Sequence, residues 1–266
     1  MSFTQTLTRP SPKHFTSLVL IGESPLGRDP AEVLDFALSR LQEVGVKLIE
    51  WRALIYRRMK VPLMVKDYSY LVPDDQVALA STTLADLGLP LTAPTKFNLN
   101  VYGDFEARGR RHLITRDTSG FLAQHIMLYP QSFSILSEAD LETAPPSHHI
   151  SPRSPTIRVP SVPAVYASLI RMLLNCPPLG STWTILQCEL SELVGYHLLD
   201  LCDGFVDPGD EQEWKNKKVD EKIPSAVDIV QSWGKNGRWK DGEGWIAEAL
   251  VVLVRTGDLP PLARTS

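Results

Sequence analysis

The sequence predicts an α+β fold, in which a small mixed β-sheet core precedes a helical C-terminal half. Up to about residue 135, short apolar runs with strand periodicity alternate with amphipathic helical patterns. A segment rich in proline and serine follows, and beyond it apolar residues recur at helical spacing. We therefore divide the chain into a leader with a first strand (1–28), an α/β core (29–143), a Pro-rich connection (144–163) and a helical C-terminal region (164–266).

The composition argues against several kinds of partner. Acidic residues outnumber basic ones by 31 to 27, so no overall positive charge draws the chain to nucleic acid. No apolar run reaches the ~18 residues that a membrane-spanning helix needs. Cysteines are few, widely spaced and odd in number, which predicts buried thiols in a reducing compartment: Cys176, Cys188 and Cys202. We expect a cytoplasmic protein without a nucleic-acid or membrane partner.

The chain begins with a polar leader, which we expect to be frayed over Met1–Pro12. A β-rich run within His14–Gly22 predicts a first short strand. The next segment, Gly22–Gly27, has a serine between glycines, but Pro25 removes the backbone N–H that a nucleophile elbow would need. We therefore expect a loop there and not a hydrolase site.

The central part of the chain predicts the order helix, strand, short helix, strand, helix. Asp29 is a good N-cap before Pro30, and the helix that they open should end at Gly45. A β-rich run then enters a helix-prone segment, which Pro62 stops. The predicted strands are Val46–Glu50 and Leu63–Val72, and the following helix is Asp74–Leu87.

Further elements follow from the same periodicities. Clean alternation predicts three more strands: Phe97–Tyr102, Arg111–Thr115 and Ala123–Tyr129. The helical stripes of the C-terminal region are Val162–Leu173, Leu186–Leu201, Pro224–Trp233 and Trp245–Arg255, with a charged loop at Asp207–Glu221. We expect the adjacent histidines of the Pro-rich connection, His148 and His149, to be solvated, and His197 to be a core histidine. The glycines of 234–244 are expected to make turns.

The layout of Val46–Gln76 resembles the core of the nucleotidyltransferase fold. In that family, Gly-Gly or Gly-Ser at a strand–helix junction precedes a strand with an Asp-x-Asp pair. Here Trp51 and Arg52 fill the glycine positions, Asp67 the first carboxylate position and Ser69 the second. The segment Leu-Val-Pro-Asp-Asp-Gln that ends the stretch is similar to a fungal set of such proteins. The resemblance implies a nucleotidyltransferase-like core that works beside a fungal biosynthetic pathway.

The resemblance also implies a metal site, of which this chain keeps one ligand. Neighbouring carboxylates on one strand face bind the two Mg²⁺ ions that hold the reacting phosphates. Asp67 is the metal ligand that remains, since Ser69 is neutral and the strand expected to carry the third carboxylate offers Gln124 and His125. We therefore expect a pseudoenzyme that acts as a binding or accessory protein, with a protein, a small molecule or a nucleotide as its partner.

Five cations lie close to Asp67 in the sequence: Arg52, Arg57, Arg58, Lys60 and Lys66. One interpretation is a nucleotide site in which Arg52, Arg58 and Lys66 bind phosphate and an aromatic ring stacks on a base. The other interpretation is a solvated helix face whose arginines pair with Glu50 and Asp67, and the sequence favours this second one.

Two enzymatic alternatives stay open. The first is an active transferase that uses Mg²⁺ on Asp67 with an acid recruited from elsewhere, such as Asp104 or Asp117. The second is a metal-independent acid–base enzyme of secondary metabolism, in which His125 or His112 titrates. The sequence does not identify a ligand or a cofactor.

Overall fold

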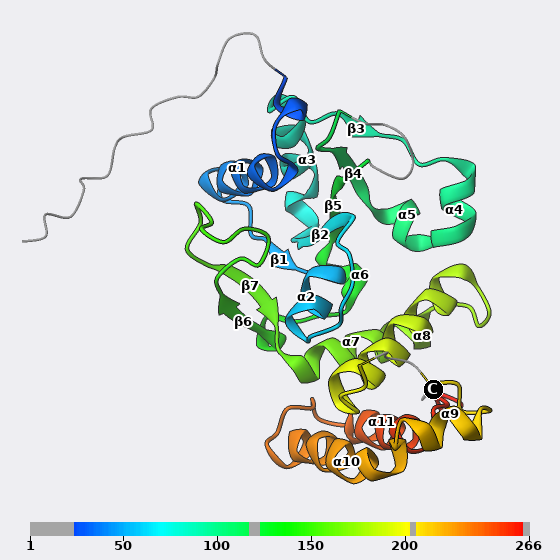
Figure 1. The fold of residues 1–266 in the computed structure, drawn as a ribbon. Coiled ribbons are helices and arrows are strands. Elements are labelled where there is room, and N and C mark those ends of the chain that lie inside the picture. Colours follow the sequence, from blue (N-terminus) through cyan, green and yellow to red (C-terminus); the bar gives the residue numbers. More distant parts are fainter. Residues whose placement is uncertain (1–23, 117–122, 203–205, 263–266) are drawn as a thin grey trace, which may run out of the picture.

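The computed structural model describes residues 24–116, 123–202 and 206–262. The predicted leader, the predicted first strand and Asp117 lie outside these ranges. Figure 1 shows one mixed sheet with helices packed around it, and a set of C-terminal helices stacked beyond its lower end. The expected α+β architecture with a mixed sheet and a helical C-terminal part is confirmed.

The sheet has seven strands in the order β3-β4-β5-β2-β1-β7-β6. Their bounds are β1 Ile49–Glu50, β2 Asp67–Val72, β3 Leu91–Thr92, β4 Arg110–Leu113, β5 His125–Pro130, β6 Leu141–Ala144 and β7 Ile157–Pro160. At the centre, β2 pairs antiparallel with β1 and parallel with β5, and β7 runs parallel to β1 on the other side. The remaining neighbours, β3–β4, β4–β5 and β6–β7, are antiparallel.

The predicted order of elements around the central strands is confirmed. Asp29 accepts a hydrogen bond from the Ala31 N–H and so caps the first helix, with proline at its first position as expected. Gly88, in a left-handed conformation, follows the third helix. The helices are α1 Pro30–Glu43, α2 Ala53–Arg58 and α3 Val77–Asp86, the last preceded by a 3₁₀ turn at Asp74–Gln76.

The strand predicted at Phe97–Tyr102 is wrong, because this segment forms the short helix α4 Lys96–Tyr102. Thr95 caps the helix by accepting a hydrogen bond from the Asn98 N–H. The alternating apolar side chains, which would face a core in a strand, are largely exposed instead, and Phe97 is 71% exposed. Gly103 (φ 54°) ends α4, and α5 Asp104–Arg108 follows directly.

The connection at 144–163 is more ordered than predicted. Strand β7 lies inside it and supplies a core strand of the sheet, with Ile157 and Val159 buried. The expectation of solvated histidines is wrong for His148, which is buried and lies 3.2 Å from an Asp35 carboxylate oxygen. This segment is therefore fixed against α1 and β1.

The C-terminal half is helical as predicted. After the short α6 Gln131–Ser134, its helices are α7 Val162–Asn175, α8 Ser181–Leu193 with a π-helical turn at Val194–Leu198, α9 Glu211–Asn216, α10 Val219–Lys235 and α11 Gly244–Thr256. The loop predicted at Asp207–Glu221 is wrong, because α9 and the start of α10 fall within it. Among the described residues, no helix combines the length and apolar character needed to cross a bilayer.

Candidate functional site

The predicted site lies where β1 ends and where β2 and β5 begin. Asp67 and His125 are direct partners in the register of β2 and β5. The Trp51 N–H donates to the Ser69 carbonyl at 3.0 Å, which places the β1–α2 junction beside the same strand. Because side chains alternate along a strand, Asp67, Ser69 and their neighbours His125 and Met127 face the same side of the sheet.

Four charged or titratable side chains meet on this face, and we call them the Asp67 cluster: Asp67, Glu106, Arg111 and His125. His125 Nδ1 lies 2.9 Å from one carboxylate oxygen of Asp67. A terminal nitrogen of Arg111 lies 3.8 Å from the other oxygen and donates to Glu106 at 2.9 Å. The Asp67 side chain is 32% exposed, whereas that of Glu106 is only 3% exposed. The cluster therefore runs from the surface into the core.

The charge of Asp67 affects its buried neighbour Glu106. Burial raises the pKa of Glu106, the nearby guanidinium of Arg111 opposes this change, and the negative charge of Asp67 adds to it. A buried acid next to a second acid needs a cation to stay ionised, and Arg111 is placed to supply that charge.

Trp51 is a core residue of the junction between sheet and helices. Its ring contacts Tyr129 at a centroid distance of 4.9 Å, Phe133 at 5.7 Å and Phe105 at 6.0 Å. The side chain is 5% exposed and so fills the position that glycine would leave open. A void of only ≈ 10 Å³ adjoins Trp51 and Arg52, about the space that one water occupies.

Arg52 is held by the C-terminal helices and is not an open phosphate ligand. Its guanidinium donates twice to Glu189 of α8, and Tyr56 donates to the other oxygen of the same carboxylate at 2.7 Å. The guanidinium also lies 4.0 Å from the centre of the Phe105 ring. Burial opposes the charge, but the pKa of Arg52 is raised overall, chiefly by Glu189.

The Arg52 backbone has φ 50° and ψ −124°, outside the regions that side-chain-bearing residues favour. Glycine reaches this conformation without strain. The residue at the predicted glycine position thus keeps a glycine-like backbone conformation.

The other two predicted phosphate ligands lie elsewhere. Arg58 donates to Glu50 at 2.6 Å and to the Pro145 carbonyl at 2.5 Å. Glu50 is the register partner of Tyr70, whose side chain points to the face opposite Asp67. Lys66 is exposed and immediately precedes β2. The structure therefore does not bring Arg52 and Arg58 together. The predicted pairing of an arginine of this segment with Glu50 is confirmed, whereas the predicted pairing with Asp67 is wrong, because the arginine beside Asp67 is Arg111 of β4.

The alternative base His112 is separated from the site. His112 is buried on the opposite face, with its ring nitrogens 2.9 Å from Ser81 Oγ and from the Leu89 carbonyl, and burial lowers its pKa. Asp104 begins α5, where its backbone N–H donates to Thr182 Oγ1. Within the described ranges, no group of three or more His, Cys, Asp or Glu side chains could hold a metal ion. The sequence analysis did not single out Glu106, Arg111 or Glu189.

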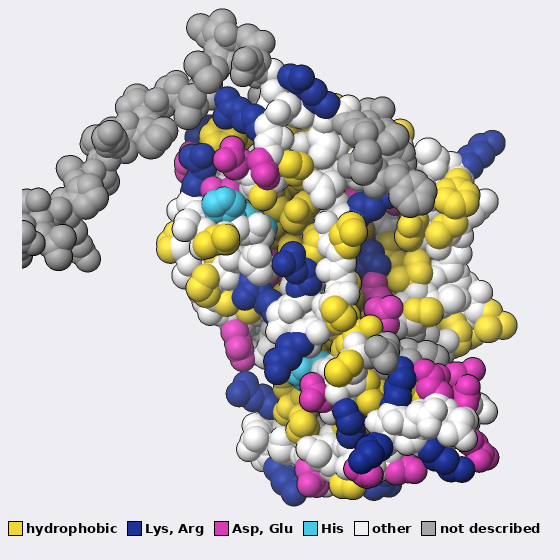
Figure 2. Space-filling view, viewed as in Figure 1, with side chains coloured by type: hydrophobic (Ala, Val, Ile, Leu, Met, Phe, Trp, Pro, Cys, Tyr) yellow, Lys and Arg dark blue, Asp and Glu magenta, His cyan; other side chains and the backbone are white. Residues whose placement is uncertain are grey.

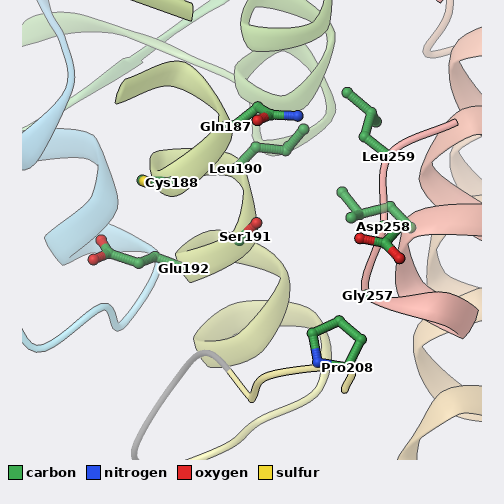
Figure 3. A pocket seen from close by; sticks show the side chains of 10 residues that line it. Gln187, Cys188, Leu190, Ser191, Glu192, Pro208, Gly257, Asp258 and Leu259 are labelled. Atoms are coloured by element: carbon green, nitrogen blue, oxygen red, sulfur yellow. The ribbon is translucent and has the colours of Figure 1, made fainter. Parts of the chain in front are cut away.

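A cavity of ≈ 350 Å³ lies away from the Asp67 cluster, between α8 and the segment that follows α11. In Figure 3, Gln187 and Leu190 of α8 point toward Leu259 across it. Its lining includes the carboxylates Glu192 and Asp258 and no Lys, Arg or His. This charge is unfavourable for a phosphate-bearing ligand. Figure 2 shows basic and acidic side chains interspersed over the visible face.

Comparisons of this chain with protein-family models, with curated proteins and with solved structures find no match.

Proposed function

We propose that this chain is a pseudoenzyme with a nucleotidyltransferase-like core, which acts as a binding or accessory protein in a biosynthetic pathway. The observation that carries the proposal is the engagement of Asp67 by its own neighbours. One carboxylate oxygen faces His125 at 2.9 Å and the other faces Arg111 at 3.8 Å. A carboxylate paired in this way is poorly placed to bind Mg²⁺ as well.

The topology supports the nucleotidyltransferase-like core. The order β1, α2, β2 with antiparallel strands, followed by α3 and by β5 parallel to β2, places His125 opposite Asp67. This is the strand for which the resemblance implies a third carboxylate. The glycine-like backbone of Arg52 at the strand–helix junction supports the same assignment.

The side chains at the same positions support a loss of phosphoryl transfer. Trp51 packs among three aromatic rings where the family has a small residue, and Ser69 is buried and neutral. Arg52 is bound to Glu189, so the triphosphate path implied by the resemblance is filled by protein.

Thermal-shift measurements with the four nucleoside triphosphates, each with and without Mg²⁺, test the proposal. A ligand at 100 times its dissociation constant stabilises the folded chain by about 2.7 kcal/mol, which gives a measurable rise in melting temperature. We expect that no nucleoside triphosphate raises the melting temperature in a way that depends on both Mg²⁺ and Asp67. When the tagged chain is used as bait, we expect it to bind a stoichiometric partner. A Mg²⁺-dependent rise that is lost in Asp67→Asn would refute the proposal.

The His125–Asp67 pair favours a second candidate, a metal-independent acid–base enzyme. A carboxylate 2.9 Å from Nδ1 orients the imidazole and leaves its other nitrogen to exchange a proton with a substrate. This candidate predicts turnover in the presence of a chelator that is lost in His125→Gln. Turnover that persists in His125→Gln would exclude it.

A further inference from the structure

The cavity between α8 and the end of α11, which we call the α8–α11 cavity, is lined by polar side chains that the protein itself does not use. Its volume of ≈ 350 Å³ is within the range of small-molecule sites, about 300–1,000 Å³. Four polar side chains line it: Gln187, Ser191, Glu192 and Asp258. In the part of the chain that the structure describes, none of the four side chains forms a hydrogen bond or an ion pair. They are therefore available to a ligand.

The remainder of the lining is mainly apolar. Leu190 and Leu253 are buried, and Pro208 and Leu259 complete the walls. A second void of ≈ 30 Å³, lined mainly by aliphatic side chains, shares part of this lining. An aliphatic chain that enters the α8–α11 cavity is thus removed from water, which favours its binding in proportion to the apolar area that is buried.

The turn that ends α11 fixes the position of Asp258 in the wall of the cavity. Gly257, with φ 75°, leads the chain out of the helix, and its backbone N–H donates to the Leu253 carbonyl at 2.8 Å. The Asp258 N–H donates to Thr256 Oγ1 at 3.2 Å. The Asp258 side chain is exposed, so the cavity is open to solvent at this point. The acid is therefore held in place and a ligand can reach it.

The charge of the lining limits the kind of ligand. In Figure 3 the Asp258 carboxylate lies across the gap from Ser191, whereas Glu192 points away on the other side of α8. Burial raises the pKa of Glu192, and the negative charge of Glu189 adds to this rise. Among the described residues that line the cavity there is no Lys, Arg or His to compensate the negative charge. The cavity therefore favours a cation over an anion.

We propose that the α8–α11 cavity binds an organic ammonium ion that carries an aliphatic chain. An alkylammonium group keeps its positive charge at pH 7, as lysine does, and has three N–H donors. It donates to the Asp258 carboxylate and to the side-chain oxygens of Ser191 and Gln187, while the chain packs against Leu190 and Leu253. Hydrogen bonds between ionised groups are stronger than neutral ones, so an alcohol of the same length binds more weakly.

Isothermal titration calorimetry of the full chain with hexylammonium, 1-hexanol and hexanoate tests this inference without any substitution. The three probes share one aliphatic chain and differ in charge. We expect one hexylammonium ion to bind per chain with a dissociation constant of about 1 mM or lower. The alcohol and the carboxylate should bind about fivefold more weakly or not at all. Hexylammonium that does not bind saturably, or hexanoate that binds as tightly, would overturn the inference.

Three variants then locate the site. Asp258→Asn removes the carboxylate that faces the gap and should weaken hexylammonium binding about fivefold. Glu192→Gln is the matched control, because it removes the same charge from a side chain that points away, and it should change the binding less than about twofold. Ser191→Leu fills the cavity with a good helix former and should abolish the binding.

Thermal unfolding followed by circular dichroism shows which variants are folded. Folded Asp258→Asn or Ser191→Leu that binds hexylammonium as the unmodified chain does would overturn the inference, and so would equal effects of Asp258→Asn and Glu192→Gln. If a variant does not fold, the comparison of the three probes on the unmodified chain decides the outcome. The cavity lies apart from the Asp67 cluster, so failure of this test leaves the proposed function unchanged.

Discussion

Replacing Arg52 by glycine and by alanine separates two opposing effects at one residue. Both substitutions remove the guanidinium that donates to Glu189 and lies over Phe105. Only glycine also relieves the backbone, which has φ 50° and ψ −124°. Alanine keeps the Cβ and with it the strain. Both variants lose the same ion pair, so the difference between their free energies of unfolding reports the backbone strain.

The magnitudes follow from the burial of the pair. The side chains of Arg52 and Glu189 are 20% and 13% exposed, and breaking such a pair leaves the carboxylate with Tyr56 as its one remaining side-chain donor among the described residues. We expect the loss of the ion pair to cost each variant about 3 kcal/mol of unfolding free energy. The alanine variant keeps the backbone strain, which costs about 2 kcal/mol, and the glycine variant does not. The greater conformational freedom of glycine in the unfolded chain offsets about 1 kcal/mol of this advantage. Arg52→Gly should thus be more stable than Arg52→Ala by about 1 kcal/mol.

Urea unfolding followed by circular dichroism gives the two midpoints and slopes. With equal slopes, the glycine variant should unfold at the higher urea concentration. Tyr56→Phe is a useful control, because it removes one hydrogen bond to Glu189 and leaves the backbone of Arg52 unchanged. A glycine variant no more stable than the alanine variant would refute the strain and, with it, one support for the nucleotidyltransferase-like junction.

Three further predictions concern stability. Trp51→Ala should lower the free energy of unfolding by about 3–5 kcal/mol, because it empties the centre of an aromatic cluster. Phe97→Ala, at an exposed position of α4, should change it by less than about 0.5 kcal/mol. Equal effects of the two substitutions would contradict the packing. Burial lowers the pKa of His112, so the contribution of the neutral imidazole to stability is present above pH ~6.5 and is lost as the pH falls below that value. The free energy of unfolding should then decrease by up to about 1.4 kcal/mol per pH unit. His112→Gln should flatten this slope between pH 7.5 and 5.5, and an unchanged slope would refute the prediction. Burial opposes the ionisation of Asp140, but hydrogen bonds from Ser137 and Lys240 lower its pKa overall. Its stabilisation is therefore present above pH ~4 and is lost progressively as the pH falls further. Asp140→Asn should cost about 2 kcal/mol at pH 7 and progressively less below pH ~4, and a cost independent of pH would contradict the account.

Local signals were sufficient for much of the fold. The Asp29–Pro30 start of α1 is encoded within a few residues and was predictable. The predicted stop at Pro62 is not where α2 ends: the helix ends at Arg58, and Lys60 follows with φ 67°. The segment at Phe97 shows the limit of such signals, because alternation over six residues fits a strand and a short helix equally well. There the cap supplied by Thr95 favours the helix.

The candidate site was predictable only in part. Asp67 and His125 could be singled out because both lie on predicted strands, and the structure makes them neighbours. Arg111 and Glu106 escaped notice because their roles depend on the pairing of β4 with β5 and on the packing of α5, which the sequence does not reveal locally. The partner of Arg52 could not be predicted, since Glu189 is 137 residues away.

The central claim is that the Asp67 cluster is closed by its own charges and does not transfer nucleotides. Its most direct test is to measure pyrophosphate release from each of the four nucleoside triphosphates in the presence of Mg²⁺. The release by the unmodified chain is compared with the release by Asp67→Asn. The account predicts that the two chains release pyrophosphate at the same background rate. Release by the unmodified chain that requires Mg²⁺ and disappears in Asp67→Asn would contradict it.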